Sequence, residues 1–177
     1  MLQLLIDSDS CPASIRTIIL RACRKNCIDS VFAADRSIPD VLVAIAEHTH
    51  DLRQQLLASG GSPDQIRSIR SPIQMQVVAT GDNSADDYLV SICQPGSLSV
   101  TRDILLANRL IERGSIVITD RGQVLDRSNI AHRLSEKNAN SAFREAGMFD
   151  TEQNTPLSPR DIRTFSNSFN SALSRLL

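Results

Sequence analysis

The sequence predicts an α/β fold, with a three-layer α/β/α arrangement around a mainly parallel sheet of about five strands. The first observation is the near-continuous apolar run at residues 2–6, LQLLI, which is typical of a strand buried on both faces of a sheet. The second is the strand–helix–strand pattern of residues 2–34, because two strands joined by a helix pair in parallel with a right-handed crossover. The third is that strand and helix patterns continue to alternate along the chain.

The first half of the sheet follows from apolar spacing and turn residues. Residues 13–25 place apolar side chains at helical spacing behind Pro12, which suits the first turn of a helix, and SVFAA at 30–34 predicts a second strand. Residues 39–57 predict a further helix, which we expect to break near its HTH triplet. The run MQVVAT at 75–80 predicts the third strand.

The second half repeats the alternation. A helix is expected at 86–93, where an acidic first turn suits the helix dipole, followed by a strand at 97–101. Apolar spacing through 105–111 predicts the next helix, which Gly114 ends before a fifth strand at 115–119. Two polar-rich amphipathic helices complete the chain, at 128–146 and 158–176.

We interpret residues 1–177 as a single domain with an inserted helix and loop excursion around 45–72. The length is that of one ordinary domain, and a hydrophobic content of 41% is sufficient for a core. The stretch at 59–72, SGGSPDQIRSIRSP, is rich in Gly, Ser and Pro, which is typical of a mobile surface segment rather than a domain boundary.

Composition favours a soluble cytoplasmic protein. No apolar run approaches the roughly 20 residues of a membrane-spanning helix, and we expect no leader before the first strand. The four cysteines form no CxxC pair and no zinc-type array. We interpret Cys11 as structural, and Cys23 and Cys27 as small core residues. His48 and His50 are expected at the surface.

Charge and aromatic content limit the partners. A formal net charge of −1 gives no global field for nucleic acid, so binding of RNA would have to be local. An aromatic content of 3% supplies few residues for base stacking. The C-terminal helix carries Phe165, Phe169, Leu173 and Leu176 at helical spacing, which favours packing or a homodimer over membrane binding.

Acidic residues follow three of the predicted strands. They are Asp7 and Asp9 after the first strand, Asp86 and Asp87 after the third, and Asp103 after the fourth. In an open parallel sheet, ligands bind beyond the carboxyl ends of the strands. An isolated aspartate after a strand is usually a cap or turn residue, which is our interpretation of Asp82. Acids after three strands at once instead predict a shared site.

The predicted site is metal-dependent. Carboxylates held together repel one another and need a cation, and a set of hard oxygen ligands selects Mg²⁺ or Mn²⁺ over zinc. Such an ion activates water for attack on a phosphodiester, which predicts a hydrolase of the nuclease type. The predicted catalytic and metal-binding acids are Asp7, Asp9, Asp86 and Asp103, with Asp87 as a further ligand. The predicted substrate-binding residues are Thr101, Arg102 and Arg121.

Two other functions stay open. In a phosphatase of the haloacid dehalogenase type, Asp7 would be the nucleophile and Asp9 the general acid, but the expected lysine is absent from every predicted strand end. In a non-enzymatic domain that binds RNA or a partner protein, Arg102, Arg121 and Arg127 would contact phosphates. If Arg121 instead paired with the acids, no metal would be needed.

The motifs resemble those of the YaiI/YqxD family of PIN-like proteins, in the same order along the chain. They are IDSDSCP at 6–12, ADD at 85–87, VTRDILLA at 100–107, DRG at 120–122 and LSPRDIRTF at 157–165. The resemblance implies the fold of PIN domains, which are metal-dependent ribonucleases. By position in the family pattern, the resemblance implies that Asp7 and Asp9 are the first pair of acidic site residues, Asp86 the middle one and Asp103 the last.

The chain also departs from the family pattern at three positions. Asn83 stands where an aspartate is usual, which removes one charge from the implied set of ligands. Lys137 stands where an arginine is usual, and Asp120 where an asparagine is.

Overall fold

The sheet has the expected parallel architecture, with one more strand than predicted. The computed structural model describes residues 2–78, 84–145 and 156–177, the backbone alone for 138–145. Its strands are β1 (Gln3–Asp7), β2 (Asp29–Ala34), β3 (Ile73–Val77), β4 (Leu98–Val100), β5 (Ile116–Ile118) and β6 (Val124–Leu125). Their order is β3-β2-β1-β4-β5-β6, and only the β5–β6 pair is antiparallel.

The sixth strand arises from the turn after β5. Thr119 N–H donates to the carbonyl of Gln123 and Gly122 N–H donates to the carbonyl of Thr119, so the chain reverses at once. The returning strand is two residues long, too short to give a period-two pattern in the sequence. It covers the outer edge of β5, the last of the parallel strands.

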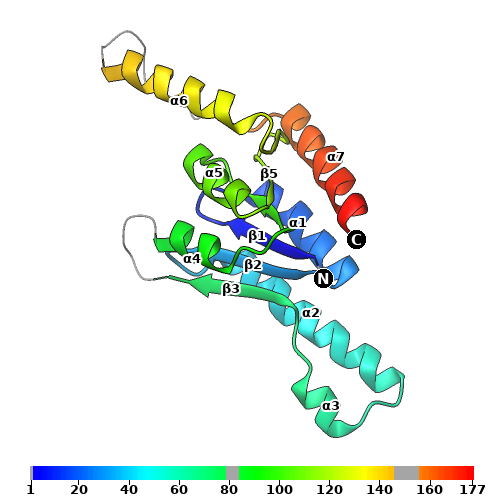
Figure 1. Cartoon of the computed structure of the whole chain (residues 1–177). Coiled ribbons are helices and arrows are strands. Elements are labelled where there is room, and N and C mark those ends of the chain that lie inside the picture. Colours follow the sequence, from blue (N-terminus) through cyan, green and yellow to red (C-terminus); the bar gives the residue numbers. More distant parts are fainter. Residues whose placement is uncertain (1, 79–83, 146–155) are drawn as a thin grey trace.

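Helices cover both faces of the sheet, which confirms the three-layer α/β/α prediction (Figure 1). They are α1 (Ala13–Asn26), α2 (Pro39–Ala58), α3 (Pro63–Ser68), α4 (Ser84–Ile92), α5 (Ile104–Glu112), α6 (Ile130–Glu145) and α7 (Pro159–Leu176). Side chains of α1, α2 and α7 share one core, and those of α4 and α5 share the other. Among the described residues, none of these helices is long and apolar enough to cross a bilayer.

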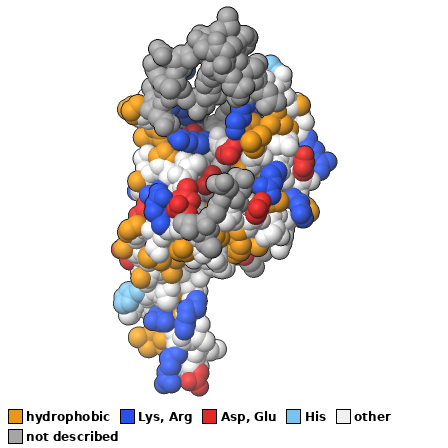
Figure 2. Space-filling view, turned by 90° about the vertical axis from the view of Figure 1, so that its left-hand side faces the viewer, with side chains coloured by type: hydrophobic (Ala, Val, Ile, Leu, Met, Phe, Trp, Pro, Cys, Tyr) orange, Lys and Arg blue, Asp and Glu red, His pale blue; other side chains and the backbone are white. Residues whose placement is uncertain are grey.

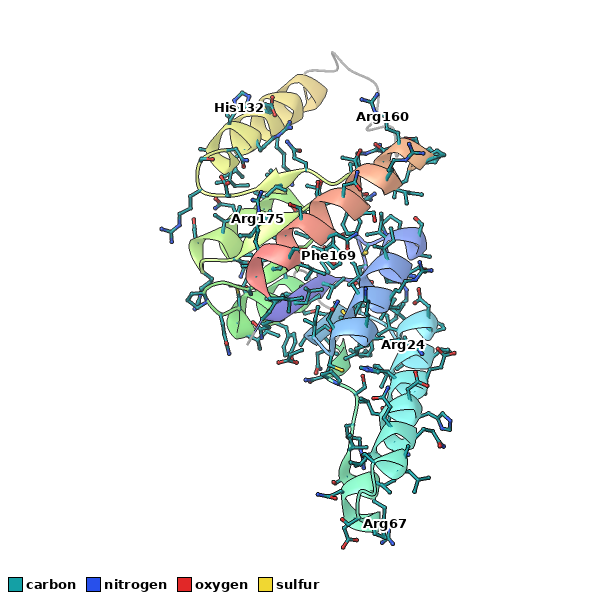
Figure 3. The ribbon with its side chains drawn as sticks, turned by 90° about the vertical axis from the view of Figure 1, so that its right-hand side faces the viewer. Arg24, Arg67, His132, Arg160, Phe169 and Arg175 are labelled. Atoms are coloured by element: carbon teal, nitrogen blue, oxygen red, sulfur yellow. The ribbon has the colours of Figure 1, made fainter. Side chains whose placement is uncertain are left out.

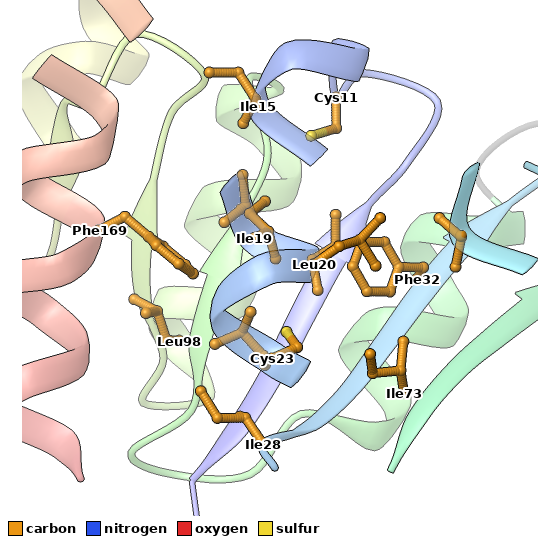
Figure 4. Packing of buried hydrophobic residues seen from close by; sticks show 14 of the residues in the cluster. Cys11, Ile15, Ile19, Leu20, Cys23, Ile28, Phe32, Ile73, Leu98 and Phe169 are labelled. Carbon is orange, nitrogen blue, oxygen red and sulfur yellow. The ribbon is translucent and has the colours of Figure 1, made fainter. Parts of the chain in front are cut away.

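The central strand β1 contributes to both cores because its side chains alternate. Leu4 and Ile6 belong to the core beneath α1 and α7, and Leu5 belongs to the core beneath α4 and α5. In the first core, Phe169 of α7 packs toward α1 and Leu98 (Figure 4). Phe169 also stacks on Phe165, with ring centroids 5.4 Å apart. The apolar face of α7 is therefore used within the chain, and a homodimer stays a prediction.

The helix after β2 differs from its prediction. α2 runs unbroken through the HTH triplet. His48 points inward from it, because its side chain is only 3% exposed and Nδ1 lies 3.0 Å from Oγ of Ser71. The surface placement predicted for His48 was therefore wrong. The expected excursion contains the short helix α3, started by a capping box at Ser62 and Gln65. With the second half of α2, it extends away from the sheet, and Arg67 lies near its end (Figure 3).

One cysteine is expected to react quickly with a thiol reagent such as Ellman's reagent. Cys27 is exposed, which corrects its predicted core position, whereas Cys11, Cys23 and Cys93 are buried. Burial also raises the pKa of Cys11 to about 12 and that of Cys23 to about 11, which disfavours the reactive thiolate. We expect one fast equivalent in the folded protein and three more after denaturation, with Cys27→Ser removing the fast one. Two fast equivalents would contradict this packing.

Candidate functional site

A cavity of about 380 Å³ opens at the carboxyl ends of the parallel strands. Its lining residues are Asp7, Asp9, Ser10, Asp35, Ser84, Ala85, Asp86, Arg102 and Asp103. Figure 2 shows the face onto which these strand ends point, with acidic side chains near its centre and basic side chains on both sides. The four acids predicted to be catalytic thus line one cavity.

Asp7, the last residue of β1, is the most firmly held of these acids. Its side chain is almost fully buried, and Oδ2 accepts hydrogen bonds from Oγ of Ser10 at 2.6 Å and Oγ1 of Thr101 at 2.7 Å. From the hydrogen bonds among the described residues, Oδ1 accepts a long one from the Ser10 N–H, at 3.4 Å. The two hydroxyls fix the carboxylate and leave Oδ1 the freer oxygen.

Asp86 lies in the first turn of α4, on the wall of the cavity. Burial is the main factor that raises its pKa to about 6, and repulsion from Asp7 and Asp103 adds to the effect. Arg109 opposes the shift weakly, because its guanidinium pairs instead with Asp87, at 2.6 Å. Ionised Asp86 is therefore costly in a cavity that holds no cation.

Asp103 has a structural task and an ionic partner. It is the N-cap of α5, where Oδ1 accepts from the N–H of Leu105 at 2.9 Å. The same oxygen accepts from Nζ of Lys137 in α6, at 3.1 Å. Thr101 connects this acid to Asp7, because its hydroxyl oxygen accepts from the Asp103 N–H at 3.0 Å. One hydroxyl therefore ties the ends of β1 and β4 together.

Asp9 lies at the side of the cavity nearest β2. Its Oδ2 accepts from the backbone N–H of Asp35 at 2.9 Å, and Oδ1 lies 3.3 Å from Nη1 of Arg36. Burial, the largest effect, and repulsion from Asp35 raise the pKa of Asp9, although the backbone hydrogen bond and Arg36 oppose the rise. Asp9 is thus already partnered by a cation, whereas Asp86 forms no ion pair with a described residue.

The other predicted site residues divide into two groups. Arg102 lines the cavity, and Thr101 supports it from a buried position in which its hydroxyl is fully engaged. Asp87 and Arg121 do not line it. Asp87 pairs with Arg109, and Arg121 pairs with Asp161 of α7, at 2.9 Å. Within the described part of the chain, Arg121 thus pairs with an acid of α7 and not with one that lines the cavity.

Sequence reasoning missed two charged residues of this region. Asp35 directly follows β2, so the same rule that selected the other acids would have found it. Lys137 reaches Asp103 from 34 positions further along the chain, and only its place in the family pattern drew attention to it. Asp82 and Asn83 lie outside the described residues.

Carboxylate oxygens are the donors that hard divalent cations prefer. Within the part of the chain that the structure describes, no three His, Cys, Asp or Glu side chains are arranged to hold a metal. Mg²⁺ usually takes only one or two carboxylates and keeps several waters. Asp7, Asp86 and Asp103 place carboxylates along one cavity, and the charges of Asp7 and Asp103 act against ionisation of Asp86.

Fold and cavity define an α/β protein with a largely parallel sheet and carboxylates gathered where its strands end. Residues 39–175 match the model of a family described as "Uncharacterized BCR, YaiI/YqxD family". This match covers more than half of the chain, which therefore belongs to the YaiI/YqxD family, as its motifs predicted.

Relatives match over about three quarters of the chain or more. The UPF0178 protein of Pseudomonas entomophila is 31% identical over 171 residues, which cover 97% of this chain and 95% of the relative. That of Myxococcus xanthus is 31% identical over 176 residues, or 99% and 97% of the two chains. The UPF0178 protein of Psychrobacter cryohalolentis is 33% identical over 135 residues, covering 74% and 87%. No solved structure matches the chain.

Proposed function

We propose that this protein is a Mg²⁺- or Mn²⁺-dependent phosphodiester hydrolase of the PIN-like ribonuclease type. The observation that carries the proposal is the convergence of Asp7, Asp86 and Asp103 on one cavity, where repulsion and burial raise the pKa of Asp86 to about 6. Such an arrangement is unfavourable for stability alone, but it suits a divalent cation.

The residues of the cavity have distinct tasks in this proposal. Asp7, Asp86 and Asp103 would hold the cation, directly or through water, while Ser10 and Thr101 keep the Asp7 carboxylate in place. The cation would activate a water and neutralise charge on the phosphate. Arg102 lines the same cavity, and we assign its guanidinium the contact to a phosphate of the substrate.

The phosphatase alternative has one observation in its favour and two against it. Lys137 does reach an acid of the cavity, although it contacts Asp103 rather than the nucleophile that this chemistry needs. Asp7 is only 6% exposed, and Oδ2 is engaged by two hydroxyls, which suits a positioned ligand better than an attacking nucleophile.

The test is calorimetric titration of Mn²⁺ into the parent protein and into an Asp7→Asn/Asp103→Asn variant, followed by cleavage of labelled single-stranded RNA. We expect the variant to lose both binding and cleavage, because it removes two of the three converging charges. Asp87→Asn is the matched control, since Asp87 lies beside Asp86 but pairs with Arg109 outside the cavity. It should bind Mn²⁺ like the parent.

The other outcomes identify the alternatives. Absence of Mn²⁺ binding in the parent would refute the proposal and leave a domain that recognises RNA or a protein without cleaving it. Hydrolysis of p-nitrophenyl phosphate, without cleavage of RNA, would indicate the phosphatase instead.

A further inference from the structure

Lys137 forms an ion pair with an acidic residue of the cavity. Its Nζ lies 3.1 Å from Oδ1 of Asp103, and Asp103 lines the acidic cavity. Helix α6, which carries Lys137, packs against α5 and projects beyond the sheet (Figure 1). A cation is thus brought to the cavity from an element that is not part of the sheet.

The sequence of α6 fixes which side of the helix meets the cavity. Ile130 is buried and Leu134 is half-buried, and both pack in the core beneath α4 and α5. Lys137 is seven residues after Ile130 and three after Leu134, so it lies on the same face of the helix, one turn further out. The apolar residues anchor α6, and Lys137 is the first residue of this face beyond them.

The pair with Asp103 is poorly suited to a purely structural role. Both side chains are 38% exposed, and exposed ion pairs contribute little to stability. Asp103 already caps α5 through the Leu105 N–H, and Lys137 shares that same oxygen. The long, flexible stem of a lysine also lets its ammonium move between partners at small cost.

We propose that Lys137 is a substrate-binding residue, which pairs with Asp103 in the free protein and is transferred to a phosphate of the nucleic-acid strand during turnover. This inference rests on the proposed function. A divalent cation held by Asp103 repels the ammonium and weakens the pair. Arg102, the neighbour of Asp103 in the chain, lines the cavity and supplies a second cation for the same strand.

The proposal predicts opposite effects on cation binding and on cleavage. In Lys137→Met, Asp103 loses a competing cation, so we expect Mn²⁺ to bind about fivefold more tightly. The same variant lacks a contact to the phosphate, so kcat/KM for single-stranded RNA at saturating Mn²⁺ should fall about a hundredfold. Lys137→Arg keeps the charge and should recover most of the cleavage.

The controls separate this role from a structural one. Lys25→Met removes the chain's other lysine, which is exposed in the last turn of α1, and should change neither quantity.

Parallel losses of Mn²⁺ affinity and cleavage in Lys137→Met, with a lower melting temperature, would show that the pair only supports the fold. Parental cleavage in Lys137→Met would also overturn the inference, while leaving the proposed function intact. A parent that neither binds Mn²⁺ nor cleaves RNA would instead refute the proposed function, and this inference with it.

Discussion

Gly122→Ala is expected to lower the free energy of unfolding by about 3–5 kcal/mol, the largest effect on stability of the substitutions we propose. A Cβ atom at this position would lie 2.5 Å from the backbone N of Phe165 and 2.6 Å from the carbonyl carbon of Thr164. Both atoms belong to the backbone of α7, so no side chain can rotate to make room. The φ angle of +79° adds strain for any residue with a Cβ.

Urea unfolding of the parent, Gly122→Ala and Gly96→Ala measures this effect. Gly96 has nearly the same φ, +82°, but a Cβ there would meet nothing within 4 Å. Its substitution isolates the backbone strain, which we expect to cost about 1 kcal/mol. Equal losses of unfolding free energy in the two variants would mean that α7 shifts away from the added Cβ at little cost. The close approach of Gly122 to α7 would then not contribute to stability.

This contact gives a structural role to two of the family motifs. The DRG turn brings Gly122 against α7, and Arg121 of the same turn pairs with Asp161 in the LSPRD segment. Asp161 also forms the capping box of α7 with Ser158, whose hydroxyl is the main factor that lowers the pKa of Asp161. The two motifs therefore dock α7 onto the end of β5.

Much of the sheet could be predicted because its signals are local. The apolar run before Asp7 identifies a buried central strand, and period and turn residues locate four more strands. The rule that parallel strands end at a common edge then brings Asp7, Asp86 and Asp103 together. These inferences require only that neighbouring residues and the direction of the chain be known.

The choice of ionic partners could not be predicted in this way. Arg121 and Lys137 are both cations near acidic motifs, yet Arg121 pairs with Asp161 and Lys137 with Asp103. Each pairing depends on how α6 or α7 packs, over 34 or more positions of sequence. The burial of His48 could not be predicted for the same reason. A polar side chain in a helix is expected at the surface unless its buried partner, here Ser71, is known.

Asp86→Asn is expected to abolish cleavage while making the metal-free protein more stable. Loss of one of three converging carboxylates should reduce Mn²⁺-dependent cleavage of RNA by about a thousandfold. In the folded protein, burial and repulsion from Asp7 and Asp103 raise the pKa of Asp86 to about 6, above its ordinary value of 3.8. Ionised Asp86 therefore opposes folding near neutral pH, and asparagine removes that cost.

The size of this stability difference depends on pH, and its sign depends on Mn²⁺. Because the folded pKa is raised, the favourable contribution of protonated Asp86 is complete below about pH 4 and is lost as the pH rises through 6. In EDTA at pH 7.5, we expect urea unfolding to show that the variant is more stable than the parent by about 1–2 kcal/mol, a modest value because Asp86 is only partly buried. At pH 4, the two proteins should be equally stable. With Mn²⁺ the order should reverse, because only the parent gains binding energy.

Asp87→Asn should show neither the gain nor the reversal, since Arg109 already compensates that charge. A destabilised Asp86→Asn in EDTA at pH 7.5 would mean that Asp86 supports the fold, and the uncompensated cavity would no longer favour a cation.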